Sequence, residues 1–110
     1  MIKEDSKPVA VRFFTALDEL KARKIIRGTQ TFTRRYGLNR RNFGVLRNDL
    51  DAYIGRFDVA WLVYLVRDYK ISPLWLLLGE GSMWMNGWTP DDVKTWSKMQ
   101  NVCKEKQTPA

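Results

Sequence analysis

Residues that begin and end helices follow one another at short intervals along this chain. Ser, Thr, Asn and Asp cap the first turn of a helix, proline fits its first position, and glycine accepts the left-handed conformation that ends it. These signals divide the sequence into short segments, so we predict a set of short helices. The expected starting residues are Thr29, Asn39, Asp58, Ser72 with Pro73, and Thr89 with Pro90, and the expected ending residues are Gly28, Gly37 and either Gly79 or Gly81.

Apolar residues recur at helical spacing in three N-terminal segments. Spacings of three and four residues place side chains on one face of a helix, which must then be buried. We expect Leu38 to be an apolar anchor in the tight turn between the second and third segments. The expected buried faces contain Phe13, Leu17 and Leu20 in residues 9–26, Phe32 and Tyr36 in residues 29–36, and Phe43 with Leu46 in the helix after Asn39.

The second half of the chain continues the pattern after a polar connection at residues 49–56. Residues 59–66 are apolar on every side, which fits a central helix or a buried strand, and the continuation through Tyr69 favours a helix. Further helices are expected at residues 73–78 and from Thr89 to about Lys104. The predicted fold is therefore all-α, a compact bundle of five short helices plus a C-terminal helix.

Positive charge is concentrated in one quarter of the chain. The formal net charge is +7, yet residues 21–47 contain nine Lys and Arg and no Asp or Glu. The remainder is slightly acidic, so the whole positive excess belongs to this segment. Such a patch suits an acidic partner, either nucleic acid or an anionic membrane surface. A solvated face that only keeps the protein dissolved is the alternative explanation.

Several classes of function are disfavoured by composition. The chain has no histidine and one cysteine, Cys103, so it can form neither an internal disulfide nor a Cys/His zinc site. The commonest general base is also missing, and we expect neither an enzyme nor a cofactor. Asp49 and Asp51 read as solvent-facing acids rather than metal ligands. The apolar run at residues 59–66 is far shorter than a membrane span, so we expect a cytoplasmic, nucleoid-associated protein without a membrane partner.

Two stretches carry a resemblance to a known family. Thr29–Asn48, TQTFTRRYGLNRRNFGVLRN, resembles the helix-turn-helix of phage repressors and Cro proteins, also called xenobiotic-response-element-type regulators. Trp75–Trp84, WLLLGEGSMW, is similar to the sequence after the DNA-binding helices of some phage-type repressors. The resemblance implies a helix-turn-helix DNA-binding domain at residues 9–84, between a flexible N-terminus at 1–8 and a C-terminal helical extension at 85–110.

The resemblance also assigns residues to DNA. It implies that the third helix enters the major groove and reads base edges with Arg40, Arg41 and Val45. Two arginines in a first turn oppose the helix dipole, which costs each roughly 0.3 to 1 kcal/mol and indicates a functional reason for their presence. The residues expected at phosphates or on the flanks of the reading face are Thr29, Gln30, Asn42, Gly44, Arg47 and Asn48.

The sequence thus predicts a sequence-specific regulator that binds double-stranded DNA, in the manner of a phage-type repressor. A homodimer on two half-sites is expected, with Pro90–Lys104 as the candidate dimerisation helix and no small-molecule ligand. The alternative is a helix-turn-helix protein-interaction module, an antitoxin or phage adaptor, without operator specificity. Binding of single-stranded nucleic acid through stacked aromatics is a third, weaker interpretation.

Other residues leave two interpretations open. For Arg34 and Arg35, contact with DNA and simple exposure to solvent are about equally expected. Trp61 and Trp75 are most simply interpreted as core residues. The tryptophans outside the predicted bundle, which fit either the core or the cover of an interface, are Trp84, Trp88 and Trp96.

Overall fold

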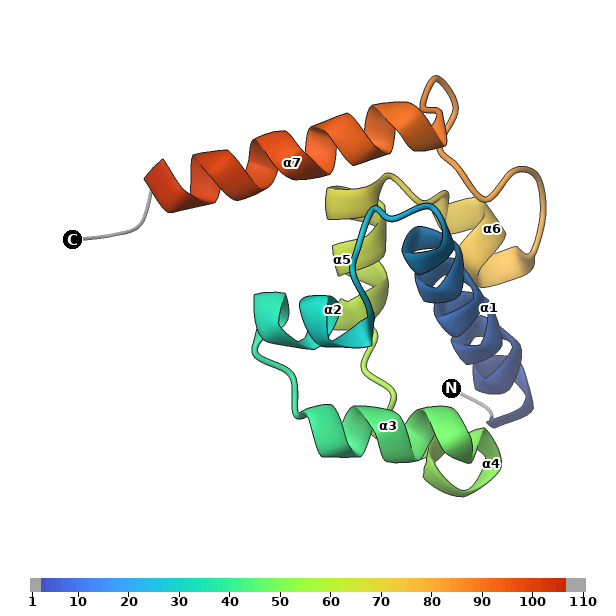
Figure 1. Cartoon of the computed structure of the whole chain (residues 1–110). Coiled ribbons are helices and arrows are strands. Elements are labelled where there is room, and N and C mark those ends of the chain that lie inside the picture. Colours follow the sequence, from blue (N-terminus) through green and yellow to red (C-terminus); the bar gives the residue numbers. More distant parts are fainter. Residues whose placement is uncertain (1–2, 107–110) are drawn as a thin grey trace.

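The structure, a computed structural model, describes residues 3–106 as a compact all-α globule (Figure 1). Within that range there are seven α-helices, one 3₁₀ turn and no strand, which confirms the all-α prediction. The helices are α1 Lys3–Ala22, α2 Thr29–Tyr36, α3 Arg40–Asn48, α4 Leu50–Tyr53, α5 Ala60–Tyr69, α6 Pro73–Leu78 and α7 Pro90–Lys106, with the 3₁₀ turn η1 at Ile54–Arg56.

The first helix starts and ends earlier than its periodicity predicts. α1 begins at Lys3 rather than Val9, so most of the segment expected to be flexible is helical. It ends at Ala22 because Lys24 takes a left-handed conformation, with φ 60°. The N–H of Lys24 donates to the carbonyl of Lys21 and that of Ile25 to the carbonyl of Leu20, at 3.0 and 2.9 Å. This is a Schellman motif with lysine where glycine is usual.

Most of the other predicted helix ends are confirmed. The side chain of Asn39 accepts from the backbone N–H of Asn42 at 3.0 Å, and Ser72 accepts from Trp75 at 3.4 Å. Thr89 and Asp92 cap each other's backbone N–H groups, both at 3.2 Å. The left-handed residues that end α2 and α6 are Gly37 and Gly79, with φ 65° and 72°, and the carboxylate of Asp58 accepts from the N–H of Ala60.

Two expectations about helix boundaries are wrong. Thr29 is the first helical residue of α2, and the N-cap before it is Gly28, which has no side chain to offer the free N–H groups. The predicted connection at residues 49–56 is almost entirely helical, because Asp49 caps α4 with a bond of 3.2 Å to the N–H of Ala52. Leu50 and Tyr53 then pack against the core. Disorder is also expected at residues 105–110, but α7 continues through Lys106, and residues 107–110 lie outside the described residues.

Aromatic rings form the centre of the core. Phe13 of α1 is fully buried, and its ring centroid lies 5.7 Å from that of Phe32 on α2 and 6.0 Å from that of Phe43 on α3. Phe57 and Trp61 complete the cluster at 5.4 and 5.8 Å. Edge-to-face and tilted arrangements of this kind stabilise beyond simple burial. One phenylalanine therefore fixes the relative positions of α1, α2 and α3.

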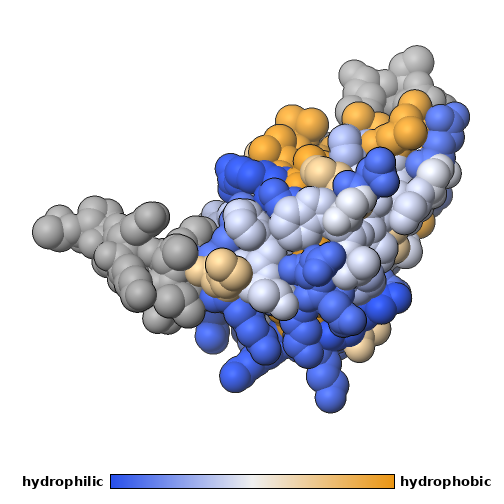
Figure 2. Space-filling model, turned by 90° about the horizontal axis from the view of Figure 1, so that it is seen from above, coloured by the Kyte–Doolittle hydropathy of each residue, from blue (hydrophilic) through white to orange (hydrophobic). Residues whose placement is uncertain are grey.

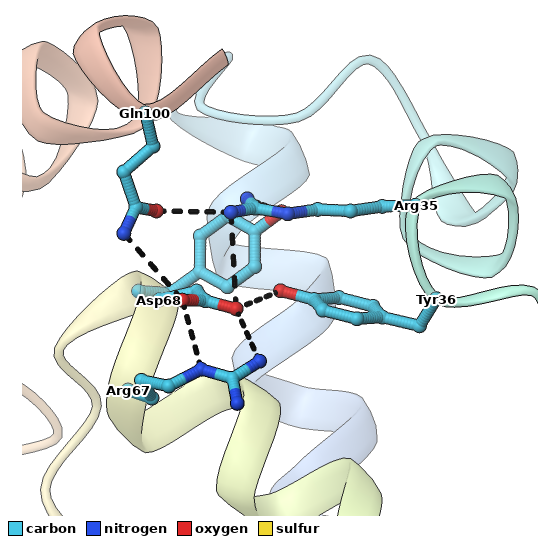
Figure 3. A network of polar contacts seen from close by, with 6 residues as sticks. Arg35, Tyr36, Arg67, Asp68 and Gln100 are labelled. Carbon is cyan, nitrogen blue, oxygen red and sulfur yellow. Dashed lines mark hydrogen bonds and ion pairs between the residues drawn. The ribbon is translucent and has the colours of Figure 1, made fainter. Parts of the chain in front are cut away.

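A buried polar network joins α7 to the body of the molecule (Figure 3). The Asp68 carboxylate on α5 lies 3.7 Å from Arg35 on α2, accepts a hydrogen bond from Tyr36 at 2.6 Å and receives two from Arg67. Arg35 also donates to the side chain of Gln100 on α7 at 2.9 Å. Burial would raise the pKa of Asp68, but the hydrogen bonds from Arg67 and Tyr36 and the nearby guanidinium charges outweigh it and lower that pKa. Burial, followed by the bond to Asp68, raises the pKa of Tyr36.

The tryptophans divide between the core and the seam with α7. Trp61 is buried, and Trp75, Trp84 and Trp88 are half-buried and pack against the core. Trp84 pairs with Ile71 in an isolated antiparallel bridge. Trp88 and Trp96 stand edge to face at 5.8 Å, with the Lys70 ammonium 5.2 and 4.7 Å from their ring centres. These contacts are cation–π interactions that close the loop before α7 onto α5.

Arg12 clamps the short helix α6 to α1. Its guanidinium donates to the backbone carbonyls of Leu76 and Leu77, at 2.7 and 2.8 Å. Gly79 is required beside it, because φ is positive there and an added Cβ would lie 3.2 Å from Arg12 Nη1. The last turn of α6 is thereby held against α1.

Among the described residues, every helix is too short or too polar to cross a lipid bilayer.

Candidate nucleic-acid interface

Helices α2 and α3 are joined by a tight turn and share one buried seam. Leu38 in the turn donates its N–H to the carbonyl of Thr33 at 2.9 Å. The rings of Phe32 and Phe43 face each other across the seam at 6.1 Å. Phe43 and Leu46 are fully buried, as predicted, so the opposite face of α3 is fixed toward solvent. In Figure 1, α3 lies at one end of the molecule and α7 at the other.

The first turn of α3 presents two unpaired cations. Arg40 and Arg41 are both exposed, and neither has a hydrogen-bond or ion-pair partner within the described part of the chain. No acidic residue stands in this first turn to offset them. The absence of internal compensation leaves both guanidinium groups available for an external anion. Asn48 is also exposed, whereas Val45 is half-buried.

A groove runs between the start of α2 and the side of α3 that carries Arg40, Gly44 and Arg47. Gly44 forms part of its wall, and an added Cβ at Gly44 would meet no atom within 4 Å, so internal packing does not require glycine there. Five of the nine predicted site residues come together in this groove, whereas Arg41, Asn42, Val45 and Asn48 do not line it. The groove has a volume of about 360 Å³ and is lined by Asp18, Lys21, Thr29, Gln30, Arg40, Phe43, Gly44 and Arg47.

The N-terminus of α2 opens into a second, polar groove. Because Gly28 provides no capping side chain, the positive end of the helix dipole at Thr29 and Gln30 is left for solvent or an anion. Basic side chains surround it on both sides. This groove has a volume of about 590 Å³ and is lined by Lys21, Arg27, Gly28, Thr29, Gln30, Thr31 and Arg34.

Three of the predicted site residues, Arg47, Thr29 and Asn42, form side-chain contacts within the protein. The guanidinium of Arg47 is ion-paired with Asp18 of α1, lies 3.4 Å from the Thr29 hydroxyl and covers the Phe14 ring. Asn42 accepts a hydrogen bond from Arg56 at 3.3 Å. Arg47 therefore holds α3 against α1, and any phosphate it contacts competes with Asp18.

The structure separates the neighbouring arginines of α2. Arg34 is exposed and lines the polar groove, so it belongs to the cationic surface. The side chain of Arg35 is only 9% exposed in the ion pair with Asp68, so Arg35 is a structural residue. Their positions differ by one step of about 100° around the helix, which turns one outward and the other inward.

Sequence reasoning did not assign some residues that shape this surface. Lys21, Arg27 and Arg34 belong to the basic segment, but only the fold shows that they line grooves beside α2. Arg56 lies in the segment expected to be a connection and Asp18 lies outside the predicted buried face of α1, yet Arg56 bonds Asn42 and Asp18 is ion-paired with Arg47. The sequence contained one usable signal for the lysine and two arginines, namely their position within the segment that lacks acids.

No protein-family model, curated protein or solved structure matches this chain.

Proposed function

We propose that this protein is a transcriptional regulator of the phage-repressor type that binds double-stranded DNA sequence-specifically through a helix-turn-helix formed by α2 and α3. The observation that carries the proposal is the pair of exposed, uncompensated guanidinium groups of Arg40 and Arg41 at the start of α3. Arginines so placed gain charge-assisted hydrogen bonds only when an external acceptor is present.

The chemistry of each site residue follows from its place on α3. Arg40 and Arg41 have the length and the donor geometry to bond guanine O6 and N7 in the major groove. Val45, one turn after Arg41, supplies an apolar contact for a thymine methyl group. The glycine-capped start of α2, with Thr29 and Gln30, suits a backbone phosphate.

The surrounding cations provide affinity without specificity. Lys21, Arg27 and Arg34 line the polar groove at the start of α2, beside the proposed reading helix. Lysine and arginine at such positions release counterions from DNA whatever its sequence. The site therefore combines a small reading surface with a larger phosphate-binding surround.

A homodimer on two half-sites about one helical turn apart would double the sequence that is read.

Selection of bound duplexes from a random library tests the proposal directly. The wild type is expected to enrich a short symmetric motif. Arg40→Ala and Arg41→Ala should each relax particular positions, because a good bidentate contact supplies about 1 to 3 kcal/mol of discrimination. Lys98→Ala is the matched control: it removes the same charge from an exposed position on α7, at the far end of the molecule in Figure 1, and should retain the motif.

Salt dependence separates the outcomes. Roughly six phosphate contacts predict a log–log slope near −5 on B-DNA. Binding that depends on salt but enriches no motif would replace sequence-specific regulation by non-specific binding. Absence of duplex binding at low salt would overturn the proposal and favour the protein-interaction module.

A further inference from the structure

An apolar groove separates α5 from α6, away from the basic segment. Its floor is made by Leu62 and Leu76, which are 7% and 1% exposed. Its walls carry exposed apolar side chains, including Val59 and Val63 at 63% and 50% and Leu77 at 51%. Figure 2 shows hydrophobic side chains gathered along one edge of the molecule, with hydrophilic ones along the opposite edge.

The chemistry of this groove fits protein side chains better than a small ligand. Its volume is about 290 Å³, at the lower end of the range for small-molecule sites. Such sites also carry a few converging polar groups that orient the ligand. Here the single charged member of the lining is Arg67, which is bonded to Asp68. A patch of this kind on a small protein marks an interaction surface.

The residues along α5 are arranged so that a second, antiparallel copy of the helix would meet them with opposite charges at the ends and apolar side chains between. Two adjacent rows of side chains follow α5 and the two residues before it, one through Asp58, Leu62 and Val66 and the other through Val59, Val63 and Arg67. An antiparallel copy related by a two-fold axis sets the first row against the second. Each Asp58 then faces an Arg67 of the other copy, and apolar residues face each other between them. Both charged residues are exposed, and the Arg67 side chain is 58% exposed.

We propose that the α5–α6 groove is the interface between two copies of this chain, with the two α5 helices antiparallel. Each copy offers both a hollow, floored by Leu62 and Leu76, and a projecting Leu77 beside it. A two-fold interface needs such self-complementarity, because the same surface serves both partners. Two Asp58–Arg67 pairs at the ends of the apolar contact set its register and its direction.

In this arrangement the dimer interface is formed by α5 and α6, and not by α7, which contains the dimerisation helix expected from the sequence. The inner side of that helix is occupied, since Val93 is fully buried and Gln100 joins the network of Arg35 and Asp68. The groove also shares no lining residue with the cationic surface of α2 and α3. The association is independent of the proposed function, because it requires no nucleic acid.

Sedimentation equilibrium of the full chain without DNA tests the interface. The wild type should approach twice its monomer mass as its concentration rises. Val63→Asp and Leu77→Asp, both at exposed positions that leave the core intact, should weaken association about tenfold or more. Met99→Asp is the matched control: Met99 is 57% exposed on α7, and its replacement should leave association unchanged.

A charge exchange tests the antiparallel register. Asp58→Arg and Arg67→Asp each place like charges opposite one another in a homodimer, so each variant alone should be mainly monomeric. An equimolar mixture restores both opposite-charge pairs and should form the heterodimer. Because Asp58 also accepts from the N–H of Ala60 and Arg67 also donates to Asp68, circular dichroism of each variant checks that it is folded. A wild type that stays monomeric, loss of association in Met99→Asp alone, or failure of folded variants to pair when mixed would overturn the interface.

Discussion

The carboxylate of Asp68 on α5 lies 3.7 Å from the guanidinium of Arg35 on α2, and their side chains are only 6% and 9% exposed. Arg35 stands in the most basic part of the sequence, yet its charge is used inside the fold. The same carboxylate binds Tyr36 and Arg67 and lies beside Gln100 of α7. Three helices therefore depend on one acid for their relative positions.

Removal of that acid should strongly destabilise the fold. Asp68→Ala leaves the Arg35 charge buried without its anion, and breaking such a pair from one side costs about 3 kcal/mol or more. Glu80→Ala, at an exposed acid outside the network, should change the unfolding free energy by less than about 0.5 kcal/mol. Urea denaturation measures both values. Equal effects of the two substitutions would contradict a structural role for Asp68.

The same network predicts how stability depends on pH. The pKa of Asp68 is lowered in the folded state, so acid protonates the unfolded chain first. The contribution of Asp68 is full above the unfolded value of about 3.9 and is lost as pH falls through the lower folded value. The difference in unfolding free energy between wild type and Asp68→Asn should therefore shrink below about pH 4. A constant difference from pH 7 to pH 3 would show that ionisation of Asp68 does not matter.

Gly44 provides a test in which stability and binding move in opposite directions. An alanine Cβ there meets no atom within 4 Å, so Gly44→Ala should stabilise α3 by up to about 1 kcal/mol. Gly44 is expected at a phosphate or on the flank of the reading face, so the same methyl group should weaken duplex binding if DNA approaches the backbone there. Thermal denaturation and binding titration give the two results. Gly55→Ala, which also meets open space, is the control for added bulk, and unaltered DNA affinity in Gly44→Ala would remove Gly44 from the interface.

Asp18 is expected to restrain the DNA affinity of the α3 groove. It is the acidic residue in that lining, and it holds the guanidinium of Arg47. Asp18→Asn should release Arg47 for a phosphate, raise duplex affinity and steepen the salt slope by about 0.9. Glu19→Gln makes the same change of charge one residue along α1, at a side chain bonded to Arg23. The same increase in both variants would indicate a general charge effect.

Local chemistry made much of this fold predictable. The caps at Asn39, Ser72 and Thr89, and the left-handed glycines at positions 37 and 79, are decided by residues within one helical turn. The buried faces of α2 and α3 follow from helical spacing in the same way. Arg40 and Arg41 were expected to be exposed, and they are.

The remainder depends on contacts between distant segments. Nothing near Lys24 indicates that a lysine, rather than Gly28, takes the left-handed conformation that ends α1; burial of Ile26 against the core supports that turn. Arg34 and Arg35 are equivalent in sequence until Asp68, more than thirty positions away, is placed beside one of them. Lys21 joins the candidate site for the same reason, because the last turn of α1 lies beside the start of α2.

The clamp made by Arg12 has a consequence for encounter with a partner. A helix of six residues has little stability of its own. The carbonyl groups of its last turn have no partner within the helix, so they ordinarily bond water and the last turn frays. Two of them are instead held by one guanidinium from α1. The ridge at Leu77 is consequently rigid before any second molecule arrives. Little conformational freedom remains to be lost on contact, so even a modest apolar surface can yield a measurable affinity.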